Sequence, residues 1–403
     1  MEPPRQGELR APRASGRSRQ ARVKAYQAMG AAWGLASMLA DEDPHVALRV
    51  FILDNSGSTS QSDGHVLEKD SRGQFRSVQA TRWEEICATA LDQAAWNARG
   101  GVRTDFILLN PPCPQDPAEG RDFVTVDPNR GNATEQVKVL AQVLRCNGPR
   151  GTTPLTQRLL QLDSRLQREV RDGRRIVLSI VTDGLPTSPH SGDCTDRDKN
   201  DFIAVLRRFT VAFNSFVVIR LATDSDSTVE FYNKIDDELE LPLDILDDLE
   251  GEAKEVNACG NGWLAYSPLI HRIREGGTME KLFDLLDERP LKGTAIPSVA
   301  KEGFASGGSG RTTDCSGTPE EEEITKLLEF VLPRAGDTPL PRDPAELFKV
   351  ATEIVAEAPL VYNGRLGRMT PPVNLKQLKK SLGQNSLQRL KALPGRMVRA
   401  LFH

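Results

Sequence analysis

The stretch Arg49–Ser58, RVFILDNSGS, begins as a short apolar strand and ends in an Asp-x-Ser-x-Ser cluster. The carboxylate of Asp54 and the hydroxyls of Ser56 and Ser58 are therefore predicted to share one tight turn at the carboxyl end of the strand. Oxygen atoms of this kind are the ligands that Mg²⁺ prefers, but these side chains are too few to complete an octahedron. The missing ligands must come from elsewhere in the chain, from water or from a partner.

Two later segments offer oxygen-bearing side chains suited to complete such a site. Gly151–Leu155, GTTPL, is a turn that opens a helical stretch and supplies hydroxyls. Arg175–Gly184, RIVLSIVTDG, is a strand that ends in Asp-Gly. In this order, with two segments at strand ends and one at a helix start, the three closely resemble the von Willebrand factor type A (vWA) domain and its metal-ion-dependent adhesion site. The resemblance covers roughly residues 46–290.

The resemblance implies a site for Mg²⁺, or Mn²⁺, that is built from five side chains: Asp54, Ser56, Ser58, Thr153 and Asp183. It implies that the two serine hydroxyls bind the ion directly and that the two aspartates act largely through bound water. The threonine enters or leaves the coordination of the ion as the site changes state, and one coordination position remains for a carboxylate of the protein ligand. Thr153 is preferred to Thr152 because it keeps the family's spacing to Leu159, and the choice between the two threonines stays open.

Candidate strands and helices alternate along the middle of the chain, which is typical of a doubly wound α/β sheet. The candidate strands are Arg49–Leu53, Asp105–Leu109, Phe123–Val126, Ile176–Val181 and Phe216–Leu221. The candidate helices are Arg82–Ala98, Thr134–Leu144, Pro154–Arg171, Lys199–Phe213 and Met279–Glu288. No helix separates the second and third strands, so we expect a hairpin with one antiparallel edge strand in a mostly parallel, Rossmann-like sheet. Asp54, Thr153 and Asp183 then meet above the carboxyl edge of the sheet, where open α/β sheets bind ligands.

Charge is distributed unevenly, although the net charge of the 403-residue chain is only −4. Residues 1–27 carry seven Lys or Arg against two Glu, residues 224–255 carry thirteen Asp or Glu against two Lys, and residues 365–403 carry nine basic residues and no acidic one. The acidic segment is predicted to be a solvated helical insertion, with docking of a basic partner or of the basic tail as the alternative.

The C-terminal region contains two predicted helices, Ala345–Ala356 and a basic amphipathic helix that Asn374 caps and that runs to Leu393. The basic helix either packs on its own domain or binds an anionic membrane or an acidic partner. No specific nucleic-acid binding is predicted.

Four regions are predicted along the chain: a basic N-terminal extension with a helix at 1–45, the vWA-like domain at 46–290, a Gly/Ser/Pro-rich linker at 291–344 and a basic helical region at 345–403. Ala28–Ala40 follows a basic segment, as the apolar part of a signal peptide does, but Ala and Gly dominate it, which favours a helix packed on the domain edge. The six cysteines are scattered without a Cys-x-x-Cys pair, which disfavours a zinc site and favours reduced thiols. A soluble, cytoplasmic protein is expected.

The most favoured function is that of a non-enzymatic intracellular scaffold, which uses a divalent cation to bind a protein ligand that presents an Asp or Glu. A metal-dependent hydrolase or phosphatase that uses the same cation is the alternative. The sequence contains no phosphate-binding loop, no Gly-x-Ser-x-Gly elbow and no His-Glu-x-x-His motif, and His65, His190 and His271 lack an evident nucleophile partner. A turn that Asp and Ser order without any ion is a further alternative.

Overall fold

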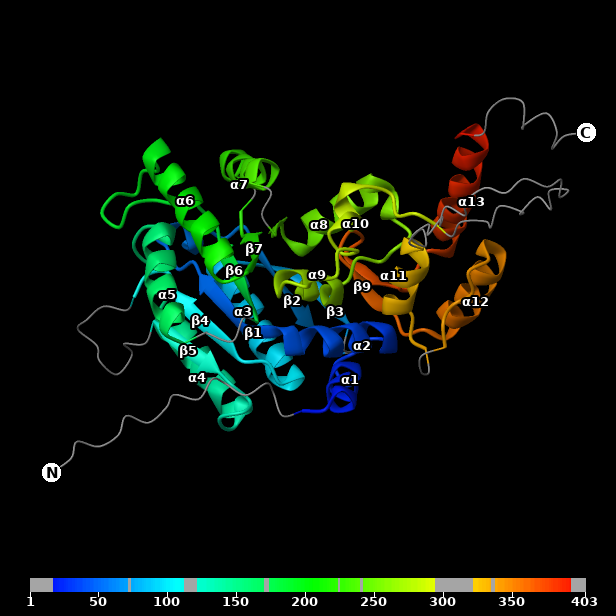
Figure 1. The fold of residues 1–403 in the computed structure, drawn as a ribbon, viewed down its shortest axis with the longest axis horizontal. Helices are drawn as coiled ribbons and strands as arrows, with labels where there is room; N and C mark the ends of the chain where they lie inside the picture. The colour runs from blue at the N-terminus through cyan, green and yellow to red at the C-terminus, as the bar shows by residue number, and fades with distance from the viewer. Residues whose placement is uncertain are drawn as a thin grey trace, which may run out of the picture.

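The computed structural model describes residues 17–71, 74–111, 122–169, 174–223, 225–239, 242–293, 322–334 and 338–392. Among these residues, the main sheet has six strands in the order β5–β4–β1–β6–β7–β8 (Figure 1). The strands are β1 (Val46–Leu53), β4 (Thr104–Leu108), β5 (Phe123–Val126), β6 (Arg175–Thr182), β7 (Phe216–Leu221) and β8 (Leu243–Leu246). All neighbouring pairs are parallel except β4 and β5. The predicted α/β fold with one antiparallel edge strand is therefore confirmed.

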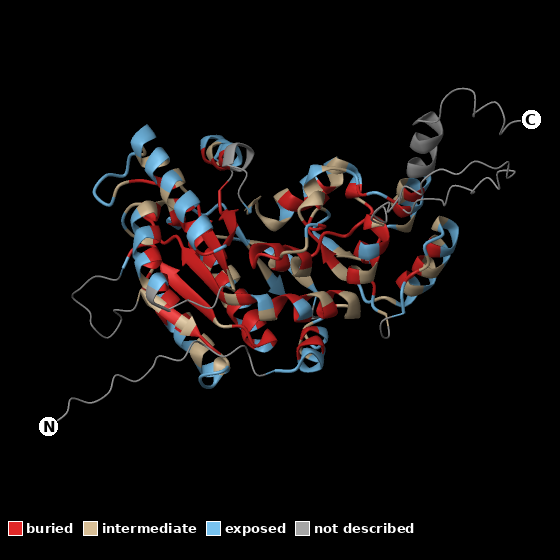
Figure 2. Ribbon diagram, viewed as in Figure 1, coloured by how far each residue is buried: buried red, intermediate tan, exposed pale blue. Residues whose placement is uncertain are grey.

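Helices cover both faces of this sheet. On one face, α5 (Leu155–Glu169), α6 (Asp196–Ala212) and α7 (Asp226–Leu239) bury apolar side chains against β1, β6 and β7. On the other face, α3 (Arg82–Gly100) and α4 (Ala133–Cys146) pack on β1, β4 and β5. The central strands are consequently buried along almost their whole length (Figure 2), as expected for a parallel sheet that lies between two helical layers.

Local sequence signals set the ends of α3. Thr81 and Glu84 form a capping box, in which the Thr81 hydroxyl accepts from the Glu84 N–H and the Glu84 carboxylate accepts from the Thr81 N–H. Gly101 follows the last helical residue with a φ of 87°, a conformation that glycine adopts without steric cost. These signals fix where α3 begins, and its first turn lies at the carboxyl end of the sheet, where Arg82 contacts Asp183 and Glu85 contacts Arg220.

The register of the central strands brings their carboxyl ends to one level. Leu53 of β1 lies opposite Leu108 of β4 and Val181 of β6. The residues that follow β1 and β6, Asp54 and Asp183, therefore leave the sheet side by side. This edge is where open α/β sheets place their ligands.

A second apolar core lies beside the sheet and joins segments from both ends of the chain. The helices that contribute to it are α1 (Arg19–Gln27), α2 (Trp33–Glu42), α8 (Leu249–Val256), α9 (Pro268–Glu275), α10 (Leu285–Glu288), α11 (Glu323–Val331), α12 (Pro344–Glu357) and α13 (Leu375–Ala392). This core buries Leu35 of α2, Leu328 of α11 and Phe283, which lies just before α10. The predicted N-terminal extension, the 46–290 region and the C-terminal region thus share one core, and α11 lies inside the stretch predicted as a linker.

Two small antiparallel hairpins complete the described strands. One pairs β2 (Gly64–Lys69) with β3 (Phe75–Ala80), and the other pairs β9 (Val361–Asn363) with β10 (Arg368–Thr370). Short helical turns lie at Asp43–His45 (η1), Gly57–Ser60 (η2) and Asn257–Asn261 (η3). Neither of these two hairpins is among the strands expected from the sequence.

Two sequence predictions need correction. The acidic segment 224–255 is not only a helical insertion, because it contains the edge strand β8, which pairs parallel with β7. The apolar side chains of Tyr232 and Leu246 in this segment are buried. The helix predicted over Met279–Glu288 is shorter, since only Leu285–Glu288 is α-helical. The first residues of the predicted helix are not helical because they are held elsewhere: the Glu42 carboxylate accepts hydrogen bonds from the Thr278 hydroxyl and the Met279 N–H.

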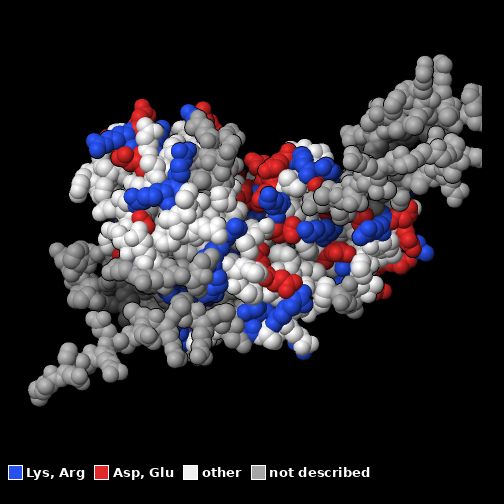
Figure 3. Space-filling view, viewed as in Figure 1, with Lys and Arg blue, Asp and Glu red and all other residues white. Residues whose placement is uncertain are grey.

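The helix predicted within Ala28–Ala40 begins only at Trp33, as α2. The remaining helix predictions agree with the described residues, and α12 and α13 are capped by Asp343 and Asn374. The described cysteines are free: Cys87, Cys146, Cys194 and Cys259. The Gly/Ser-rich stretch 305–310, Cys113 and Cys315 lie outside the described residues. Within the described part of the chain, no helix is both long and apolar enough to cross a bilayer. Figure 3 shows acidic and basic side chains mixed over one face of the molecule.

Candidate metal centre

The five residues predicted for the metal site lie on three loops at the carboxyl edge of the sheet. Asp54 directly follows β1, and its N–H still donates to the Val181 carbonyl of β6 at 2.9 Å. Ser56 and Ser58 lie in the turn that follows, Thr153 lies just before α5, and Asp183 directly follows β6. Asp54, Ser56, Thr153 and Asp183 are buried, and Ser58 is partly exposed. The site is therefore preorganised by the sheet, with Ser58 toward solvent.

Backbone and amide hydrogen bonds hold these loops together. The Gly57 N–H donates to the Gly151 carbonyl at 3.1 Å, and the Arg150 N–H donates to the Asn55 carbonyl at 2.7 Å. Asn110, which follows β4, donates from its N–H to Asn55 Oδ1 at 2.7 Å and from Nδ2 to the Thr152 carbonyl at 2.7 Å. The turn that carries Ser56 and the turn that carries Thr153 consequently cannot separate without breaking several buried hydrogen bonds.

Gly151 has a structural reason to be glycine. Its φ is +71°, and a Cβ added there would lie only 2.7 Å from Asn110 Oδ1. A side chain would therefore push Asn110 away and weaken the junction between the loops.

Hydroxyl and carboxylate oxygens converge inside this frame. The Ser58 hydroxyl donates to Asp183 Oδ1 at 2.9 Å, the Ser56 hydroxyl lies 3.4 Å from the same oxygen, and the two hydroxyls are 3.0 Å apart. Asp54 is held from both sides, since Oδ1 accepts from the Ser56 N–H at 2.8 Å and Oδ2 accepts from the Thr182 hydroxyl at 2.6 Å. All of these are oxygen donors of the kind that bind Mg²⁺ and Mn²⁺.

The two neighbouring threonines differ in what their hydroxyls face. The backbone of Thr153 is fixed by Thr187, whose hydroxyl accepts from the Thr153 N–H and whose N–H donates to the Thr153 carbonyl, both at 2.9 Å. The Thr153 hydroxyl lies 3.3 Å from where a Cβ on Gly184 would stand, so it faces the turn that carries Asp183. The Thr152 hydroxyl instead donates to the Ser188 carbonyl at 3.1 Å.

Arg82 adds a charged group to this site that the sequence did not predict. Its Nη1 donates to Asp183 Oδ2 at 3.0 Å, and its Nε and Nη2 donate to the two carboxylate oxygens of Asp63 at 2.7 and 2.6 Å. The guanidinium is buried, and its pKa is raised above its usual range, mainly by the hydrogen bonds to Asp63. No local signal marks Arg82, because it meets Asp183 only when α3 lies across the end of β6.

The site still lacks positive charge. Burial, together with the neighbouring charge of Asp183, raises the pKa of Asp54 from its ordinary value of 3.8 to about 6, against the hydrogen bonds from Thr182 and Ser56. Asp63 and Asp183 share one guanidinium, that of Arg82, and Asp54 has no ion-pair partner among the described residues. A divalent cation at this edge would therefore relieve an unfavourable concentration of negative charge.

Three other carboxylates lie close enough together to hold a metal ion. The ligand oxygens of Glu252, Glu255 and Asp287 all lie within 4.8 Å of one another. Arg274 already pairs with two of them, however, through Nη1 to Glu252 at 2.5 Å and Nη2 to Asp287 at 2.7 Å. The pKa of Glu252 is raised to about 8, chiefly by burial. The negative charge of this second cluster is thus reduced by the buried guanidinium of Arg274 and by the raised pKa of Glu252.

Comparison with known proteins gives a distant structural match. No protein-family model matches the sequence, and no curated protein gives a significant match. Among solved structures, the chain is similar to the pilus adhesin SpaC from Lactobacillus rhamnosus GG in an open conformation. The two chains share 14% identity at a TM-score of 0.33, over 50% of this chain and 28% of the SpaC chain. The chain thus covers less than a third of the adhesin's length.

Proposed function

We propose that the edge site binds Mg²⁺ or Mn²⁺ and uses the ion to hold an Asp or Glu side chain of a protein partner, as a vWA-type adhesion site does. The observation that carries this proposal is the convergence of the Ser56 and Ser58 hydroxyls on Asp183 Oδ1, at 3.4 and 2.9 Å. Hydrogen bonds between these oxygens take the place that a shared cation would fill. The raised pKa of Asp54 supports the same conclusion, because a nearby cation favours the ionised carboxylate.

The type of ligand atom explains why the ion would attract a partner. Ser56, Ser58 and Thr153 offer neutral hydroxyls, while Asp54 is engaged with the Ser56 N–H and the Thr182 hydroxyl. An ion held directly by neutral oxygens keeps much of its positive charge for an incoming carboxylate, whereas a site lined by direct carboxylate ligands would neutralise it. Ser58 is the most exposed of these residues, so the partner is expected to approach from its side.

The hydrolase alternative has less support. The side chains that hydrogen-bond to Asp54 and Asp183 belong to Ser, Thr and Arg residues. Hydrolysis would need a group that accepts a proton from water, and Asp54, whose pKa is about 6, is the candidate, but both of its oxygens already accept hydrogen bonds from the Ser56 N–H and the Thr182 hydroxyl. We therefore propose a binding protein rather than an enzyme.

Selection of peptides provides a direct test of the proposed function. A library of random peptides is panned on immobilised protein in Mg²⁺, and bound peptides are eluted with EDTA. We expect the eluted peptides to share an Asp or Glu whose replacement by Asn or Gln removes binding, because that carboxylate completes the coordination of the ion.

Protein carrying Ser58→Ala serves as the control surface, since it lacks one hydroxyl at the mouth of the site. Peptides that bind it equally well, or that resist EDTA but dissociate at moderate salt, would show that ordinary surface charge holds them. Either result would refute the metal-bridge mechanism.

Replacing Arg82 with Gln is expected to tighten Mg²⁺ binding. The Arg82 guanidinium lies 3.0 Å from Asp183, and removing its positive charge makes the local potential more favourable to a cation. The affinity for Mg²⁺ should therefore rise by roughly 3- to 10-fold. Calorimetric titration with Mg²⁺ measures the change. Arg76→Gln is the matched control, because Arg76 forms an exposed ion pair with Glu68 at 3.1 Å and is not bonded to Asp183. Weaker Mg²⁺ binding in R82Q would mean that Arg82 orders Asp183 more than it repels the ion.

A further inference from the structure

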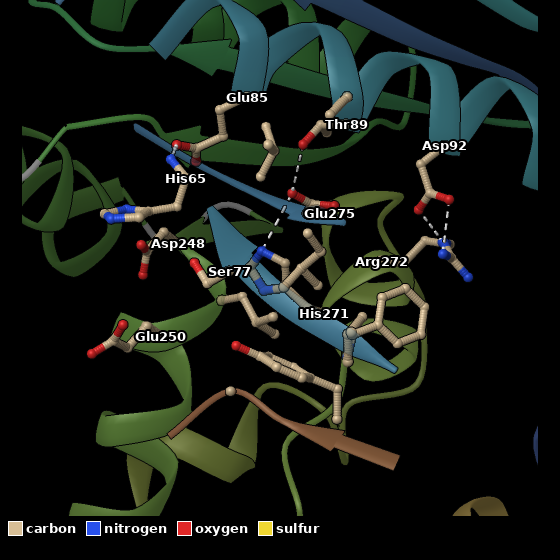
Figure 4. A pocket seen from close by; sticks show the side chains of 18 of the residues that line it. His65, Ser77, Glu85, Thr89, Asp92, Asp248, Glu250, His271, Arg272 and Glu275 are labelled. Atoms are coloured by element: carbon tan, nitrogen blue, oxygen red, sulfur yellow. Dashed lines mark hydrogen bonds and ion pairs between the residues drawn. The ribbon is translucent and has the colours of Figure 1, made fainter. Parts of the chain in front are cut away.

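A second site-like feature is a cavity of about 480 Å³ on the α3 side of the sheet, away from the hydroxyl cluster. Its walls come from α3, the β2–β3 hairpin, β7, the start of α8, α9 and the end of β9. Figure 4 shows Glu275 and His271 near its middle, Asp248 and Glu250 on one side, and the Asp92–Arg272 pair on another. Its volume falls in the range of small-molecule sites.

The floor of the cavity is charged but internally paired. The buried guanidinium of Arg220 donates to Glu85 and lies 3.4 Å from Glu275 Oε1. His271 Nε2 lies 3.3 Å from the same Glu275 oxygen, and the Thr89 hydroxyl donates to it at 3.4 Å. Glu85 also accepts from the His65 N–H at 2.8 Å, which fixes the hairpin against α3. These pairs make the floor of the cavity polar and hold α3, β7, α9 and the β2–β3 hairpin together around it.

The rim of the cavity differs at Asp248 and Glu250, which form no ion pair with an arginine among the described residues, although the charge of Asp248 acts on nearby Arg220. Asp248 caps α8 by accepting from the Gly251 N–H at 2.6 Å, and among the described residues it has no ion-pair partner. Glu250 is exposed and pairs with Lys254 at 2.9 Å. The lining as a whole carries five carboxylates, those of Glu85, Asp92, Asp248, Glu250 and Glu275, against the two guanidiniums of Arg220 and Arg272 and the imidazoles of His65 and His271. The cavity therefore favours positive charge.

An apolar wall accompanies this acidic rim. Leu67 and Phe75 of the first hairpin, Leu249 of α8 and Tyr362 of β9 line it. The rings of Phe75 and Tyr362 meet edge to face with their centroids 6.4 Å apart. The Lys69 ammonium lies 4.9 Å from the centre of the Phe75 ring, so this ring already takes part in a cation–π contact within the chain.

We propose that this cavity binds an organic cation, an amine or guanidinium on an apolar stem, with its charged head at Asp248 and its stem along Phe75, Leu249 and Tyr362. A bare metal ion would leave the apolar wall without a contact, and a neutral apolar molecule would leave the charge of Asp248 unused. An anion would be repelled by the rim. A free amine and the Lys or Arg side chain of a peptide present the same chemistry. The inference does not depend on the metal site.

Titration with matched probes tests this inference in the full chain. Hexylamine and agmatine represent free cations, N-acetyl-lysine methylamide and N-acetyl-arginine methylamide represent peptide side chains, and 1-hexanol is the neutral analogue of hexylamine. We expect at least one cation to bind about ten-fold more tightly than hexanol, since only the cation can form a charged hydrogen bond with Asp248. Binding by the capped amino acids but not by the free amines would identify a peptide as the source, and the reverse would identify a small metabolite.

Two Asp→Asn variants separate recognition from folding. Asp248→Asn keeps an oxygen that caps α8 but removes the negative charge, so cation affinity should fall by about five- to ten-fold while the fold is retained. Asp343→Asn makes the same change at the cap of α12, where Asp343 accepts from the Ala345 and Glu346 N–H groups, outside the cavity lining. Equal affinity in the two variants, hexanol binding as tightly as hexylamine, or no binding of any cation would overturn the proposal.

Discussion

Replacing Asp54 with Asn is expected to weaken Mg²⁺ binding by about 10- to 100-fold, the usual cost of losing a group that orients a metal's ligands. The same change should raise the free energy of unfolding of the metal-free protein at pH 7. Asp54 is fully buried, and burial together with Asp183 raises its pKa from 3.8 to about 6. An ionised carboxylate in that position destabilises the fold, and Asn removes the charge at nearly constant shape.

The pH dependence of stability follows from the direction of this pKa shift. Between about pH 4 and pH 6 the folded state binds a proton at Asp54 that the unfolded state has released, so this group's contribution to stability falls as pH rises. The advantage of the Asp54→Asn protein should therefore be small at pH 4 and grow to the order of 1–3 kcal/mol at pH 7. Urea unfolding in EDTA at both pH values measures it, and calorimetry with Mg²⁺ measures the loss of binding.

A control for this experiment is Asp163→Asn. Asp163 is also a buried aspartate, but it forms an ion pair with Arg208 at 2.7 Å and lies on α5, away from the loop cluster. Its replacement should leave Mg²⁺ affinity unchanged and should not stabilise the protein, because a paired carboxylate is lost. If Asp54→Asn binds Mg²⁺ as tightly as the unaltered protein, Asp54 does not belong to a metal site.

Replacing Arg274 with Met should cause the largest loss of stability. The Arg274 side chain is 1% exposed and pairs with Glu252, Asp244 and Asp287, at 2.5, 3.2 and 2.7 Å. Without the guanidinium, three carboxylates remain together with no cation between them. Breaking a buried ion pair from one side costs about 3–5 kcal/mol, because the remaining charge stays desolvated. Chemical unfolding at pH 8 should show this loss.

A neighbouring arginine provides the comparison for this experiment. Arg272 lies on the same helix, α9, but its ion pair with Asp92 is partly exposed, so Arg272→Met should cost no more than about 1 kcal/mol. The defect of Arg274→Met should shrink at pH 5, because protonation of Glu252, whose pKa is already about 8, removes part of the uncompensated charge. Equal stability of the two variants would show that Arg274 is not the cation that holds this acidic cluster together.

The sequence alone predicted the parts of the fold that depend on local patterns. Phe123–Val126 and Phe216–Leu221 are strands with the predicted bounds, because runs of β-branched and aromatic residues between polar turns specify strands locally. The position of Asp54 and Asp183 directly after apolar strands was enough to place both at the carboxyl edge, since parallel strands end on the same side. The family resemblance then added the two serines and the threonine.

Only the tertiary structure decided which distant segments meet. Arg82 reaches Asp183 across 101 positions of sequence, Arg220 reaches Glu85 across 135, and neither pairing leaves a periodic or spacing signal in the chain. The cavity needs Phe75 and Tyr362, which belong to separate hairpins, and β8 became a strand because β7 offered it an open edge. The sequence thus determined the strands and the oxygen-rich turns at their ends, through interactions between near neighbours. The charges around the oxygen-rich cluster and the cavity come from contacts between segments that meet only on folding, and so does the core shared by the two ends of the chain.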